Sequence, residues 1–90
     1  MRVDLVVRAD KFLRSLATKQ ARQIVHKMEE LEKSGTIHGS RKMHTSGDKY
    51  YRAAAGEFRL IYKVGEVITI THIGKRNDDE IYLDFSRMPK

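Results

Sequence analysis

The stretch Lys49–Tyr82, KYYRAAAGEFRLIYKVGEVITITHIGKRNDDEIY, decides the fold of this chain. Its segment Phe58–Val64 alternates between apolar and polar positions, which is typical of a strand with one covered face. The face expected to be covered consists of Phe58, Leu60, Tyr62 and Val64. Glycine-containing turns join this segment to the extended segments Tyr50–Ala55 and Val67–Ile73. The stretch therefore predicts an antiparallel meander of three strands.

The segment before the meander begins with a predicted strand and a short helix. Apolar side chains largely alternate with polar ones over Arg2–Arg8, a pattern that indicates another strand with one covered face. Asp10 is a suitable N-cap for a short helix that places Phe12 and Leu16 on one side.

A longer helix is predicted over Lys19–Lys33, with Thr18 as its N-cap and Gly35 as its left-handed stop. Its apolar positions recur at helical spacing and are Ala21, Ile24, Val25, Met28 and Leu31. This stripe is too broad and too short for a sustained heptad seam, so its expected partner is the protein's own sheet, with a coiled coil as the alternative.

The two remaining segments are a loop and a short terminal helix. Thr36–Asp48 is rich in glycine and serine and predicts a loop with a short strand near Lys42–His44. After Gly74 the chain becomes highly charged, and Asn77 or Asp78 is placed to cap a helix that docks through Ile81 and Phe85. We therefore predict a single α+β domain spanning residues 1–90, in which two helices cover one face of the sheet and the other face is concave and basic.

Composition narrows the class of protein. The chain has 90 residues, no cysteine and no apolar run near the roughly 20 residues that span a bilayer, so a soluble cytoplasmic protein with no membrane association is expected. The net charge is +6, and eight Lys/Arg against three acids between Thr36 and Arg76 place +5 of it there. This distribution favours a polyanionic partner. The four histidines show no metal-ligand spacing, so neither a metal nor a cofactor is expected, and His72 is expected to be structural.

Three arginines and a tyrosine are the candidate functional residues: Arg52, Arg59, Arg76 and Tyr82. Arginines gathered in one concavity repel one another unless an anion occupies it, and phosphate suits their planar donors. Bases can stack on tyrosine while arginine pairs with phosphate, a combination that describes a site for single-stranded RNA. The alternative is that the strand arginines face solvent and that Tyr82 is only a core anchor.

The segments YYRAAAGEFRLIYKV and ITITHIGKRNDDEIY, preceded by a strand and two helices, resemble the RelE/ParE superfamily of toxins from type II toxin–antitoxin systems. The chain is most similar to the RelE branch, whose members enter the ribosomal A site and cut messenger RNA through attack of a 2′-hydroxyl on the adjacent phosphate. The resemblance implies that Arg59 and Arg76 stabilise the scissile phosphate, that Tyr82 stacks on a base, and that Arg52 is a further basic site residue. It also implies a ribosome and messenger as partners and a cognate antitoxin that neutralises the toxin. Additional RNA contacts are expected from Arg41, Lys42, Lys49, Lys63 and Lys75.

The chain departs from the RelE branch on the strand before the central one. That branch commonly has two lysines there, one implicated in proton transfer, whereas this chain has Tyr50 at the first position and Lys49 one residue away, on the opposite face from Arg52. Two other functions remain open, namely inhibition of DNA gyrase, as in the ParE branch, and a catalytically inactive domain that binds an antitoxin or nucleic acid.

Overall fold

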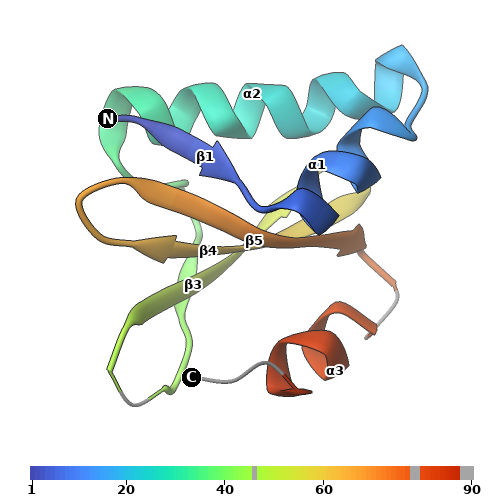
Figure 1. Cartoon of the computed structure of the whole chain (residues 1–90). Helices are drawn as coiled ribbons and strands as arrows, with labels where there is room; N and C mark the ends of the chain where they lie inside the picture. The colour runs from blue at the N-terminus through green and yellow to red at the C-terminus, as the bar shows by residue number, and fades with distance from the viewer. Residues whose placement is uncertain (46, 78–79, 88–90) are drawn as a thin grey trace.

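The computed structural model describes residues 1–45, 47–77 and 80–87, and it has an α+β fold (Figure 1). Its elements in chain order are β1 (Val3–Leu5), α1 (Val7–Arg14), α2 (Thr18–Ser34), β2 (Arg41–Lys42), β3 (Lys49–Ala55), β4 (Phe58–Val64), β5 (Ile68–Lys75) and α3 (Glu80–Arg87). The five strands form one sheet in the order β1-β5-β4-β3-β2. β1 runs parallel to β5 and the other neighbours are antiparallel, so the sheet is mixed.

The predicted meander is confirmed as β3, β4 and β5, and β4 has the bounds that its alternation indicated. Phe58, Leu60 and Tyr62 are buried in the main core, as expected for the covered face. One irregularity was not predicted. Opposite the step from Ile61 to Tyr62 the register of β5 shifts, which makes room for a β-bulge at Thr71.

The first strand is shorter than predicted, because the chain leaves the sheet in the middle of Arg2–Arg8. β1 ends at Leu5, and the backbone N–H of Val6 donates a last hydrogen bond to Ile70 O at 3.1 Å. α1 then begins at Val7 with Val6 at its N-cap position, and no side chain caps it. The prediction that Asp10 is the cap is therefore wrong, since Asp10 lies inside the helix and pairs with Arg14 at 2.9 Å. The early start of α1 is explained by the burial of Ala9, because helical geometry turns Ala9 onto the sheet.

α2 matches the predicted helix closely. It begins at Thr18 with Ala17 as its N-cap, so Thr18 is the first helical residue rather than the cap. At its end Gly35 has a φ of 75° and its N–H donates to Leu31 O, which is the left-handed stop that glycine adopts without strain. Ile24 and Leu31 are fully buried, so the apolar stripe packs on the protein's own sheet, as predicted.

α3 lies on the face of the sheet opposite α2 (Figure 1). Tyr50, Ile61, Ile81 and Phe85 form a second buried cluster beneath it, which confirms that Ile81 and Phe85 dock the helix. α3 therefore occupies part of the face that the sequence predicted to be open and basic. Of its two predicted caps, Asp78 lies outside the described residues and Asn77 lies in the turn before the helix.

β2 forms one edge of the sheet and is displaced from its predicted position at Lys42–His44. It comprises Arg41–Lys42, because these residues pair with Arg52 and Tyr51 of β3. Among the helices in the described ranges, none is long and apolar enough to cross a bilayer.

Candidate functional site

A small cavity of about 200 Å³ lies beside α3 on the face of the sheet that carries the second cluster. We call it the arginine cavity. Its lining residues are Gly39, Arg41, Arg52, Ala53, Ala54, Arg59, Arg76 and Tyr82. All four predicted catalytic residues therefore meet in one place, together with Arg41 from the predicted RNA-binding set. None of these lining residues, all taken from the described part of the chain, is acidic, and the four arginines among them concentrate positive charge there.

Strand pairing places two of the arginines directly opposite each other. Arg41 of β2 and Arg52 of β3 are register partners, and both are exposed. Like charges at directly opposed positions destabilise a sheet. A bound anion would relieve that repulsion, so this pair favours an anionic ligand.

Arg59 is the most enclosed of the arginines, since its side chain is half-buried on β4. Its partner on β3 is Ala54, whose small side chain leaves space above the sheet, and its partner on β5 is Gly74. A Cβ built on Gly74 would lie 2.0 Å from Cγ2 of Ile81. The missing side chain at Gly74 therefore allows α3 to approach the sheet beside Arg59. A glycine inside a strand is a sequence signal for such a close approach, but the sequence interpretation did not use it.

The close approach of α3 brings Tyr82 against two arginines. Arg59 donates a hydrogen bond from Nη1 to the Tyr82 hydroxyl at 2.8 Å. The guanidinium carbons of Arg52 and Arg59 lie 5.9 and 5.8 Å from the centre of the Tyr82 ring, within the range of cation–π attraction. Tyr82 is half-buried and packs against the second cluster as well. The ring thus lines the arginine cavity and also anchors α3.

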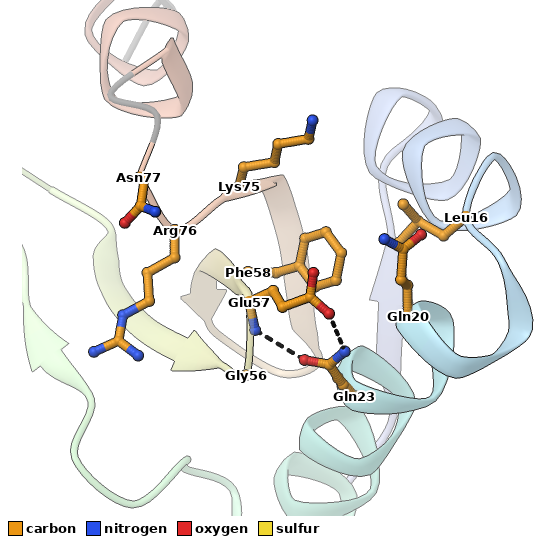
Figure 2. Close-up of a pocket in the computed structure, with 9 residues that line it drawn as sticks. All are labelled: Leu16, Gln20, Gln23, Gly56, Glu57, Phe58, Lys75, Arg76 and Asn77. Atoms are coloured by element: carbon orange, nitrogen blue, oxygen red, sulfur yellow. Dashed lines mark hydrogen bonds between the residues drawn. The ribbon is translucent and has the colours of Figure 1, made fainter.

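Arg76 reaches the cavity from the turn that follows β5. Its side chain is exposed, and its backbone N–H donates to Glu57 O at 2.7 Å. Figure 2 shows that the Arg76 and Lys75 side chains leave the chain in opposite directions. Lys75 therefore points away from the arginine cavity and lines a second, wider cleft that also includes Gln20, Gln23 and Glu57. Arg76 lines both the cleft and the arginine cavity.

The predicted RNA-binding lysines do not line the arginine cavity. Lys42 lies on the edge strand, and Lys49 starts β3 on the face that carries the main core. Lys63 is half-buried and has Asp48 as an ionic neighbour at 4.0 Å. Of the five residues predicted to contact RNA, only Arg41 lines the cavity.

Tyr50, which stands where the RelE branch commonly has a lysine, is a packing residue in this chain. It is 6% exposed, and its ring meets the edge of Phe85 at a centroid distance of 4.9 Å. His72 is also buried beneath α3, where its Nδ1 lies 2.9 Å from Thr71 Oγ1. No cluster of three or more His, Cys, Asp or Glu side chains that could hold a metal occurs within residues 1–45, 47–77 and 80–87.

Comparisons with known proteins place this geometry in context. No protein-family model matches the chain, and no curated protein matches its sequence. Among solved structures, the chain is similar to a chain of the archaeal RelE–RelB complex from Pyrococcus horikoshii OT3. The TM-score is 0.73 at 28% identity, and the match covers 84% of this chain and 94% of the other.

Two Escherichia coli structures share the fold. A mutant of the toxin RelE in the free state gives a TM-score of 0.73 at 23% identity, covering 98% of this chain and 97% of that one. The isolated RelE toxin gives 0.67 at 22% identity, covering 96% and 95%. The matches to these two structures span nearly the whole chain.

Proposed function

The chain is a protein of the RelE toxin fold, and from this premise we propose that it is an endoribonuclease that cleaves messenger RNA in the ribosomal A site. The observation that carries the proposal is the arginine cavity, which four arginines and one tyrosine line with no acidic side chain among the described lining residues. Such a cavity suits a phosphodiester with a base stacked beside it. The site of action would be the cytoplasm, where the ribosomes are.

The proposed reaction is an internal transfer at phosphorus. The 2′-oxygen of one nucleotide attacks the adjacent phosphate, the bond from phosphorus to the 5′-oxygen breaks, and the products are a 2′,3′-cyclic phosphate and a free 5′-hydroxyl. The attacking hydroxyl loses a proton and the leaving oxygen gains one. The chain must therefore align the two oxygens, stabilise the crowded phosphorane and accommodate both proton transfers.

Charge stabilisation is assigned to Arg59 and Arg76, with Arg52 and Arg41 holding the neighbouring backbone. Arg59 is half-buried, and electrostatic contacts gain strength away from water. Removal of one such contact typically costs on the order of 3 kcal/mol in the transition state, or about a hundredfold in rate. The dispersed lysines then serve long-range attraction of the messenger rather than contact with the scissile phosphate.

Positioning is assigned to Tyr82 and to the ribosome. Among the residues that the structure describes, the cavity lining contains neither a histidine nor a carboxylate to move protons. Orientation of the reacting groups is worth about 7–11 kcal/mol in well-aligned reactions, and a ribosome that holds the messenger in line would supply it. We therefore expect cleavage of naked RNA to be poor.

We further propose that a cognate antitoxin neutralises the chain. The basic surface favours an antitoxin segment that is acidic or amphipathic. A chain of similar fold occurs in a toxin–antitoxin complex, the intact RelBE complex from Escherichia coli. Co-expression with such an antitoxin should restore growth, and a chain that cells tolerate alone at high expression would contradict toxicity.

One experiment separates the proposed nuclease from its alternatives. The same preparation is assayed for cleavage of a ribosome-bound messenger and for inhibition of supercoiling by DNA gyrase. Cleavage without gyrase inhibition supports the proposal. Gyrase inhibition without cleavage would assign the chain to a ParE-like activity. If both effects are absent, the chain is a domain that only binds an antitoxin or nucleic acid.

A further inference from the structure

The side chain of Gln23 on α2 holds the turn between β3 and β4 (Figure 2). The Gln23 carboxamide oxygen accepts a hydrogen bond from the Glu57 backbone N–H at 2.8 Å. Its nitrogen donates to the Glu57 carboxylate, also at 2.8 Å. One glutamine therefore uses both ends of its amide on one residue of the turn.

The turn is shaped to admit this contact. Gly56 has a φ of 61°, the left-handed conformation that favours glycine. A Cβ at this position would lie 1.8 Å from Oε1 of Gln23. Any other residue would displace the glutamine, so the glycine and the clamp belong to one arrangement.

A third hydrogen bond extends the clamp to the arginine cavity. The Glu57 carbonyl oxygen accepts from the backbone N–H of Arg76 at 2.7 Å. Arg76 stands just beyond the end of β5 at Lys75, so this bond holds its backbone where the sheet no longer does. Figure 2 shows the two hydrogen bonds between Gln23 and Glu57, with Arg76 nearby.

We propose that Gln23 and Glu57 are positioning residues that fix the backbone of Arg76 and thereby set its guanidinium in the arginine cavity. The catalytic consequence rests on the proposed function, whereas the structural link does not. A displacement of about 1 Å at a catalytic group can cost about a hundredfold in rate. Gln23 thus acts on the site from the opposite face of the sheet without touching the substrate.

The structural link is tested by amide hydrogen exchange at Arg76. Gln23→Ala removes both bonds of the clamp and should accelerate exchange of the Arg76 N–H about tenfold, which corresponds to a 1.4 kcal/mol loss of protection. Gln20→Ala is the matched control, because Gln20 lies on the same helix and lines the same cleft. Unchanged exchange at Arg76 in Gln23→Ala, or equal acceleration in the control, would overturn the proposal. Thermal melts of both variants verify that they are folded.

The catalytic consequence is tested by a double-mutant cycle on single-turnover cleavage of a ribosome-bound messenger. Gln23→Ala should lower the rate about tenfold in the parent and in Arg59→Ala, yet have little effect in Arg76→Ala, because the group that it positions is then absent. An equal decrease in all three backgrounds would show that Gln23 does not act through Arg76. If the parent chain cleaves no messenger, the proposed function fails, and exchange at Arg76 still decides the positioning.

Discussion

Replacement of Tyr82 by phenylalanine and by alanine distinguishes the contribution of its ring from that of its hydroxyl. Tyr82→Phe keeps the ring that lies 5.8 and 5.9 Å from the two guanidinium carbons and removes only the acceptor of the 2.8 Å bond from Arg59. Both partners are half-buried, so the lost bond is worth about 1 kcal/mol. The cleavage rate should therefore fall about fivefold.

Tyr82→Ala removes the ring and should be far more damaging. Loss of base stacking costs about 1–3 kcal/mol, which lowers the rate by roughly a further fivefold to about 150-fold beyond the loss of the hydrogen bond from Arg59. The truncation also leaves a gap beside Ile81 and Phe85 in the second cluster, so unfolding should become easier by about 1–2 kcal/mol. The phenylalanine variant, which fills the same space, controls for this loss of packing.

The assay is single-turnover cleavage of one messenger, free and in the A site, together with thermal melts of each variant. The reasoning requires Tyr82→Phe to remain close to the parent while Tyr82→Ala does not. A phenylalanine variant as inactive as the alanine variant would transfer the role of Tyr82 from stacking to proton movement through its hydroxyl. Equal cleavage rates on free and ribosome-bound messenger would refute the claim that the ribosome positions the messenger for cleavage.

Three further outcomes are expected. Arg59→Ala and Arg76→Ala should each abolish growth arrest. Thermal melts should show little destabilisation for the exposed Arg76 and about 1 kcal/mol for Arg59, which loses its hydrogen bond to Tyr82. A collapsed melting temperature in either variant would show that its arginine is structural. Gly74→Ala places a methyl group against α3, so cleavage and stability should fall together, with about 1–3 kcal/mol lost in urea unfolding. The hydrogen bond from the backbone N–H of His38 lowers the pKa of Glu30, so the stability that Glu30 contributes is present above its ordinary pKa and is lost as the pH falls through the lowered value. Glu30→Gln should reduce the acid dependence of urea midpoints, and an unchanged dependence would contradict this assignment.

The parts of the fold that follow from local pattern could be predicted from the sequence. Strand β4 was bounded correctly because its alternation has a definite period, and the end of α2 was fixed by Gly35. Val6 and Val7, which follow β1, favour a strand by local propensity, and the burial of Ala9 against the sheet overrides that preference. The bulge at Thr71 and the position of β2 depend on the register of partner strands, which no local pattern contains.

The candidate site was predictable in its residues but not in its surroundings. Strand alternation and family resemblance together identified Arg52, Arg59 and Tyr82, and these residues do meet. Strand alternation separates Lys49 from the face of Arg52, but it does not predict that the other lysines lie outside the cavity. A count of charge carries no information about the face on which each side chain lies. The contact between Gln23 and Glu57 joins a helix to a distant turn, and no local sequence pattern in either segment predicts it.

The parallel pairing of β1 with β5 has a consequence for the timing of folding. Val3–Leu5 are synthesised early, yet their partners Ile68–Ile70 are added only after most of the chain. Contacts between such distant segments form slowly, because the entropy of closing a long loop must be overcome first. β5 also lies between β1 and β4, so its arrival completes two ladders at once. A nascent chain therefore lacks an assembled arginine cavity for most of its translation, which would protect the ribosome that is making it from the activity proposed here.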